Sequence, residues 1–226
     1  MNYNQFFNLT CYEEFEIQCT LNGISKVDVL KEIGHKIDDY YFLISEDGIF
    51  NWFDLKGNHV EDPGVLKILD EKYIPKTITK CVIPNSVISI CTDTFLGCKS
   101  LKEIIIPNSV ENIGGWAFCY CISLKSITIP NSITYISHEV FKYCTSLKEV
   151  FIPNSVTSIG VFAFLGCKSL EKIVIPNSVI SISHKAFCDC KSLKEVIFKG
   201  KTLEEVKQME NYPFGIKDES IIKCEM

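Results

Sequence analysis

Five cysteines have the residue type and the spacing that most directly suggest chemistry. They recur at intervals of 23 residues, as Cys98, Cys121, Cys144, Cys167 and Cys190. Stacked one strand spacing apart, neighbouring thiols would lie roughly 5 Å from each other, close enough for a disulfide. The alternative is a row of small apolar side chains that fill a core. We expect buried, reduced thiols, because the N-terminal residues do not have the pattern of a secretory signal.

Two Cys-x-Cys pairs, Cys119/Cys121 and Cys188/Cys190, are the candidates for a metal site. Three 23-residue units separate them, which is roughly 15 Å along a stack of strands. Zinc holds each sulfur ligand at about 2.3 Å, so the two pairs cannot share one ion. We expect no metal site and no other cofactor.

Two histidines, His138 and His184, occupy the same position of their units and lie six residues before Cys144 and Cys190. This spacing allows a Cys–His dyad to be considered. The two histidines would be roughly 10 Å apart, too far to chelate one metal ion. The other three units have no histidine there, so we expect surface histidines and a protein that is not an enzyme.

The cysteines belong to an internal repeat with a period of 23 residues. The motif Ile-Pro-Asn-Ser recurs with its proline at positions 84, 107, 130, 153 and 176. Five full units follow one another without insertion, at 78–100, 101–123, 124–146, 147–169 and 170–192, and a sixth begins at Leu193. A strict period of this length predicts a solenoid, in which each unit buries its apolar residues against the next.

Each unit is expected to contribute one short strand to a parallel sheet. In the unit 101–123, alternation places Ile104 and Ile106 inward, and Pro107 ends the strand because it has no N–H to donate. Residue 106 should therefore lie beside residues 83 and 129. The segment 116–118 is expected to form a short helical turn with Phe118 inside.

The pattern Leu-x-x-Ile-x-Ile-Pro-Asn-Ser-Val-x-x-Ile-Gly-x-x-Ala-Phe-x-x-Cys-x-Ser resembles the BspA-like leucine-rich repeat. The resemblance covers residues 78 to about 200, and the residues from Phe198 to Cys224 resemble the cap that closes such arrays. It implies a leucine-rich-repeat solenoid. It also implies a binding protein, since many members of that family are implicated in adhesion.

The outward position of each predicted strand is the candidate binding face. It is occupied by Val82, Ile105, Thr128, Phe151, Val174 and Ile197. β-propensity alone favours branched and aromatic residues in strands, even on an exposed face. Five of the six are nevertheless apolar and would align, and an exposed apolar patch often marks an interface. If the chain binds a protein, we predict that the contact centres on Phe151.

Residues 1–77 have no repeat and are expected to form a small α+β cap. Phe15, Ile17 and Cys19 alternate as in a strand, and a helix is expected from about Ser25 to Gly34. A hairpin is predicted from 40–44 and 49–55, and a second helix from 62–63 to about residue 72. At the other end, residues 201–226 should form a second cap, with a capping box at 202–205 opening a helix to about residue 210.

Composition limits the classes of function. The net charge is −5, and all 23 basic residues are lysines. The lack of arginine argues against a nucleic-acid-binding protein, because bidentate recognition of bases and phosphates relies on arginine. No apolar run approaches the roughly 20 residues that span a membrane. We therefore expect a cytoplasmic, non-catalytic scaffold with a protein partner, with surface association by an unconventional route left open. The alternatives are an intracellular regulator docked on an enzyme, and an enzyme with its site in residues 1–77.

Overall fold

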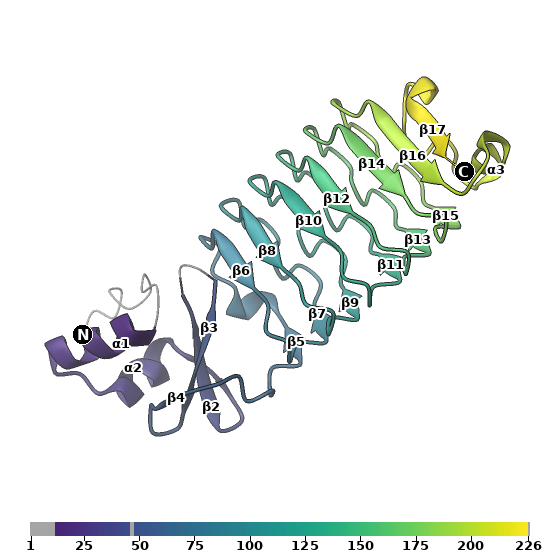
Figure 1. The fold of residues 1–226 in the computed structure, drawn as a ribbon. Coiled ribbons are helices and arrows are strands. Elements are labelled where there is room, and N and C mark those ends of the chain that lie inside the picture. The colour runs from purple at the N-terminus through teal and green to yellow at the C-terminus, as the bar shows by residue number, and fades with distance from the viewer. Residues whose placement is uncertain (1–11, 46–47, 226) are drawn as a thin grey trace.

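The computed structural model describes residues 12–45 and 48–225. Its N-terminal part contains two helices followed by a four-stranded antiparallel sheet in the order β1-β2-β3-β4 (Figure 1). The elements are α1 (Tyr12–Asn22), α2 (Lys26–Ile33), β1 (His35–Ile37), β2 (Tyr40–Ile44), β3 (Phe50–Asp54) and β4 (His59–Val60).

Two N-terminal predictions are confirmed and two are wrong. The helix after Ser25 and the hairpin of β2 and β3 form as expected. Phe15 and Cys19, however, lie in helix α1, where a spacing of four residues puts both on its buried face while Ile17 between them is 55% exposed. The helix expected after residue 62 is also absent, because the Asp62 carboxylate accepts the N–H of Gly64 in a local turn instead of capping a helix.

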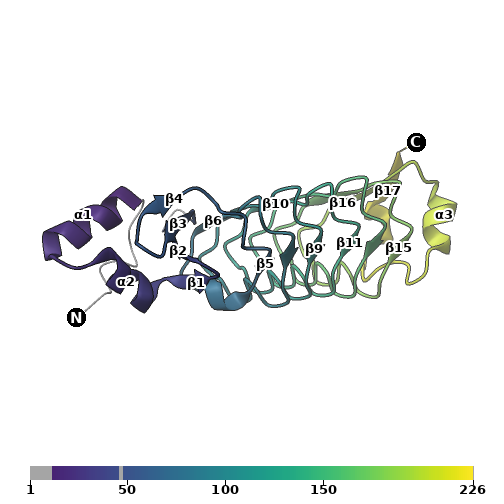
Figure 2. The same cartoon turned by 90° about the horizontal axis from the view of Figure 1, so that it is seen from below.

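The repeats form a solenoid with two parallel strand ladders on different sides of each coil (Figures 1 and 2). The first ladder contains β6 (Lys80–Val82), β8 (Glu103–Ile105), β10 (Ser126–Thr128), β12 (Glu149–Phe151), β14 (Lys172–Ile175), β16 (Glu195–Lys199) and β17 (Ile222–Glu225). The second contains β5 (Ile68–Leu69), β7 (Ser89–Ile90), β9 (Asn112–Ile113), β11 (Tyr135–Ile136), β13 (Ser158–Ile159) and β15 (Ser181–Ile182). The 23-residue pattern predicts only the first of these ladders.

The register confirms the 23-residue period. Val82 pairs with Ile105, Thr128 with Phe151, and β14 with β16 in the same register. The expected single continuous sheet is not formed, however. Within residues 67–225, the first ladder is divided into β6-β8, β10-β12 and β14-β16-β17, with no strand pairing from β8 to β10 or from β12 to β14.

The third side of each coil is a wall of turns whose inner surface carries the phenylalanines. Five buried rings stack with centroids 5.1–5.6 Å apart, and they are Phe95, Phe118, Phe141, Phe164 and Phe187. Backbone N–H groups donate from coil to coil along this wall, for example from Phe118 to the carbonyl of Val140 at 3.0 Å. Phe118 is inside as predicted.

The turn wall is not the short helical turn that the sequence suggested. Two positions in each coil have a left-handed backbone, and they are filled by Trp116 (φ 54°) and Tyr120 (φ 59°) in the coil of 101–123. A continuous helix needs negative φ at every residue, so these two positions replace it with consecutive tight turns.

The two ends of the solenoid are closed by different structures. At the N-terminal end, the β2-β3 turn contacts the first coil, where the carbonyl of Gly48 accepts the N–H of Val82 at 2.9 Å. At the C-terminal end, α3 (Leu203–Gln208) begins at the predicted capping box, in which Thr202 and Glu205 bond reciprocally. Beyond it, the fully buried Phe214 lies 6.0 Å from Phe198 and its carbonyl accepts the N–H of Phe187.

We expect the junction between the N-terminal sheet and the first coil to lose stability in mild acid. The His35 ring lies 5.1 Å from that of Phe42, tilted against it, and meets the ring of Tyr73 edge-on at 5.2 Å. Burial, assisted by Lys72, lowers the pKa of His35 below the ordinary value of 6.5. At a pH between the lowered pKa of His35 in the folded protein and its ordinary pKa in the unfolded chain, the unfolded chain binds more protons. The free energy of unfolding should therefore fall as the pH drops below about 6.5.

Thermal unfolding between pH 5.5 and 7.5 measures this effect. Replacing His35 with Gln should flatten the dependence on pH in this window. An equal slope in wild type and His35→Gln would contradict the prediction.

Candidate functional site

The outer face of the first strand ladder carries the predicted binding residues. Phe151 is 56% exposed and Ile105 is 48% exposed on this face. Thr128 is also exposed, while Val82 and Val174 are partly exposed. The structure thus places these five side chains on one open face, in adjacent coils.

The sixth predicted residue, Ile197, does not belong to this exposed face, because only 4% of its surface is exposed. It lies in β16, which pairs with β14 on one side and with the C-terminal strand β17 on the other. Its neighbour in β17 is Lys223, whose ammonium bonds the carbonyl of Ser220 at 3.0 Å. The C-terminal cap therefore lies beside Ile197, whereas the repeat pattern treats this position like the other five.

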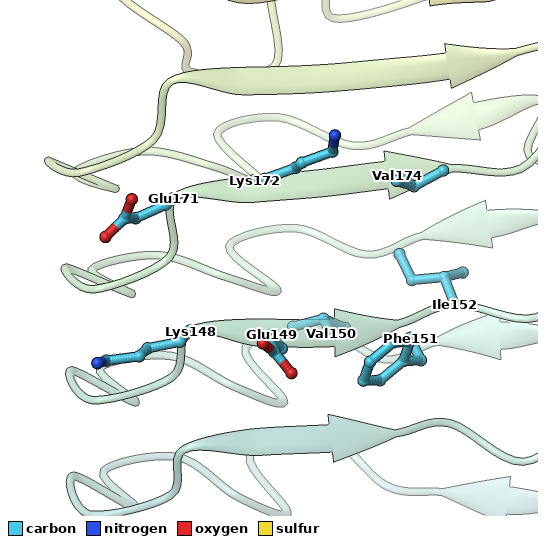
Figure 3. A pocket seen from close by; sticks show the side chains of 8 residues that line it. All are labelled: Lys148, Glu149, Val150, Phe151, Ile152, Glu171, Lys172 and Val174. Carbon is cyan, nitrogen blue, oxygen red and sulfur yellow. The ribbon is translucent and has the colours of Figure 1, made fainter.

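A groove of about 680 Å³ opens on this face between β12 and β14. Figure 3 shows its lining, with Phe151 at the end of β12, Ile152 directly after that strand, and Val174 on β14. The groove lies where the strand pairing is interrupted, and Ile152 at the end of β12 is partly exposed there. At a paired junction, the equivalent Ile129 is buried. The interruption therefore gives access to apolar surface that the repeat would otherwise enclose.

The charged rim of the groove is divided between paired and unpaired side chains. Glu171 bonds Lys194 at 2.9 Å, and Lys172 bonds Glu195 at 3.1 Å, both across adjacent coils. The pKa of Glu171 is lowered mainly by its hydrogen bond from Lys194, with a smaller contribution from Lys148. Among the described residues, the exposed Lys148 and Glu149 form no ion pair of this kind. Their charges are available to a partner.

The cysteine ladder is part of the core. Cys98, Cys121, Cys144 and Cys167 are fully buried, and Cys190 at the end of the row is partly exposed. From Cys121 onward each thiol donates to a phenylalanine carbonyl of the preceding coil, at 3.1–3.2 Å. Burial raises the pKa of every one of these thiols, to about 11 for Cys98 and to about 12 for Cys190. Such groups are poor nucleophiles at neutral pH.

The other chemical candidates are not brought into a constellation. Among residues 12–45 and 48–225, no three His, Cys, Asp or Glu side chains are placed to hold a metal ion. His138 packs edge-on against Trp116 at 4.2 Å, and His184 is exposed. A hollow between α1 and α2 contains Glu16 and Lys26, but these pair with each other at 2.7 Å.

A parallel strand ladder built from stacked 23-residue coils defines a leucine-rich-repeat solenoid. The chain belongs to the BspA type leucine-rich repeat family, which it matches in six copies over residues 67–194 and 163–215. This family and its structural relatives are in general non-catalytic repeat scaffolds for protein interaction. No curated protein matches the chain.

Several solved structures of bacterial proteins are similar to this chain. The leucine-rich repeat protein TpLRR of T. pallidum is 29% identical, with a TM-score of 0.56, over 68% of this chain and 71% of its own. The pneumococcal vaccine antigen PcpA is 23% identical, with a TM-score of 0.51, over 73% of this chain and 49% of its own. A leucine-rich cell surface protein of Faecalibacterium prausnitzii is 28% identical, with a TM-score of 0.48, over 74% of this chain and 54% of its own. The chain therefore spans about half the length of the last two.

Proposed function

We propose that this protein is a non-catalytic scaffold that binds a protein through the outer face of its first strand ladder, centred on Phe151. The observation that carries the proposal is the coincidence of an exposed aromatic side chain with a groove between β12 and β14, two adjacent strands that do not pair with each other. An aromatic residue at the centre of a patch with a charged rim is the usual composition of an interface anchor.

The use of this face in adhesion or host contact is one form of the proposal, and a regulator docked on an enzyme inside the cell is the other. Family membership supports a scaffold in both cases. In the described residues, no helix is long and apolar enough to cross a membrane. Fractionation of cells that produce the native protein separates the two forms, since each predicts a different compartment for the bound complex.

Phe151→Ala should weaken binding to a partner by roughly 1–3 kcal/mol, or about 5- to 150-fold in Kd, because a truncated anchor leaves its pocket unfilled. The measurement is calorimetric titration of a partner isolated with the native protein. Ile180→Ala is the matched control, because Ile180 is 74% exposed but lies beside β15 in the second ladder. Equal affinity of both variants and the wild type would refute this binding face.

A further inference from the structure

The order of charges at the groove is inverted in one coil. Lysine precedes glutamate in Lys102-Glu103, Lys148-Glu149 and Lys194-Glu195, whereas the coil between the last two reads Glu171-Lys172. As a result the outer face presents opposite charge orders on the two sides of the β12–β14 junction. The same junction is the site of the groove, with Phe151 on one side and Val174 on the other (Figure 3).

This arrangement is self-complementary under a two-fold rotation. Consider an axis parallel to the strands, midway between β12 and β14, that turns a second copy face to face with the first. The rotation preserves the position along a strand and reverses the order of the coils. Position 148 then lies opposite 171 of the second copy, position 149 opposite 172, and position 151 opposite 174.

The charges and side-chain sizes fit at each of these positions. Lys148 would face Glu171 of the second copy, Glu149 would face Lys172, and the large Phe151 would face the smaller Val174, each contact occurring twice by symmetry. Lys148 and Glu149 form no ion pair in the described chain, so this contact would supply them with partners. One like-charge approach, between Lys125 and Lys194 of the second copy, falls farther from the axis, outside the two strands that line the groove.

We propose that a second copy of this chain binds to the β12–β14 groove, forming an isologous dimer. The inference rests on the proposed function, because it uses the same face and names its occupant. Figure 1 shows the strands β6 to β16 in a nearly straight row, a shape that allows two such faces to approach along their length.

The size of the face predicts a weak dimer. Six strands of the first ladder lie within the overlap of the two copies, and they are β8, β10, β12, β14, β16 and β17. With about 4.8 Å between neighbouring strands and a contact about 16 Å wide along the strand direction, the contact covers roughly 460 Å² on each copy. The total of roughly 900 Å² is below the standard size of stable interfaces and is typical of transient ones. Since interfaces of about 1,600 Å² range from micromolar to picomolar, we expect a dissociation constant weaker than about 1 μM for this smaller contact.

Sedimentation equilibrium from about 10 μM to 1 mM tests the dimer, with the average mass expected to rise from 25.7 kDa toward twice that value. Two double variants each invert the charges on one side of the axis. Lys148→Glu/Glu149→Lys inverts them on the β12 side, and Glu171→Lys/Lys172→Glu inverts them on the β14 side. Each variant alone places like charges opposite each other and should dimerise at least about tenfold more weakly.

Complementation makes the test specific for this geometry. An equimolar mixture of the two variants, and a single chain with all four changes, should both recover the wild-type dissociation constant within about threefold, because opposite charges face each other again. Thermal unfolding shows that each variant is folded. Three results would overturn the inference. The first is a wild type that is monomeric at 1 mM, the second is a dimer that neither double variant weakens, and the third is a mixture of the two variants that does not restore dimerisation. A monomer would leave the proposed function standing, since the Phe151→Ala titration with another protein tests that separately.

Discussion

Phe141→Ala is expected to lower the free energy of unfolding by about 3–5 kcal/mol, the largest single-residue effect that we predict. Phe141 lies in the middle of the ring stack, 5.6 Å from Phe118 and 5.5 Å from Phe164, with only 1% of its surface exposed. Truncation removes its apolar surface from the core and leaves a cavity between two coils. Its neighbours are fixed by backbone bonds between coils, such as that from the Phe141 N–H to the Ala163 carbonyl, so the cavity cannot collapse.

Urea unfolding at pH 7 measures this loss. Phe151→Ala is the matched control, because the same truncation is made in an adjacent part of the array on a side chain that is 56% exposed. The control should cost less than about 1 kcal/mol, since most of the Phe151 ring already contacts water. Equal costs for the two variants would mean that the phenylalanine stack does not stabilise the solenoid.

Cys144 and Cys167 are expected to react with a thiol-alkylating reagent at least about 1,000-fold more slowly in the native protein than in the unfolded chain. Both are fully buried, burial raises their pKa well above the ordinary value, and each thiol is bonded to a carbonyl of the preceding coil. Reaction therefore requires opening of the core, and the equilibrium constant for opening sets the protection.

Site-resolved mass spectrometry after timed alkylation gives the rate at each cysteine. The partly exposed Cys91 and Cys188 are internal controls and should react first, and Cys190 should be less protected than Cys144 because it ends the row. Rapid modification of Cys144 or Cys167 in folded protein would show that the ladder is accessible and would reopen the question of thiol chemistry.

These two expectations follow from residues that the sequence identifies clearly. The 23-residue period alone predicts the solenoid, the strand register, the buried Phe and Cys rows and the exposed Phe151. It does so because every unit makes the same contacts with its neighbours, so one local pattern repeated in register determines the whole array. The capping box at Thr202 is equally local, since both of its bonds join residues three apart.

Apart from the helix expected after residue 62, which a local turn at Asp62 replaces, the failed predictions depended on contacts between distant parts of the chain. Phe15 and Cys19 suit a strand by alternation and a helix by their spacing of four, and packing against α2 and the N-terminal sheet selects the helix. The sequence does not indicate the left-handed turns at Trp116 and Tyr120 either, because aromatic residues do not favour that conformation. Bonds to the next coil hold them, such as that from the Tyr120 N–H to the Lys142 carbonyl.

The sequence by itself determined the repeat, its register and the side chains that alternate between core and surface. Only the tertiary structure decided how the outer face ends and where it opens. Ile197 matches Ile105 in the repeat but is buried, because β17 and the cap lie beside it. The groove beside Phe151 exists because β12 and β14 stack without pairing, although their sequences follow the same pattern as the strands that pair. Both features arise from what lies next to a strand in space, which a periodic sequence does not encode.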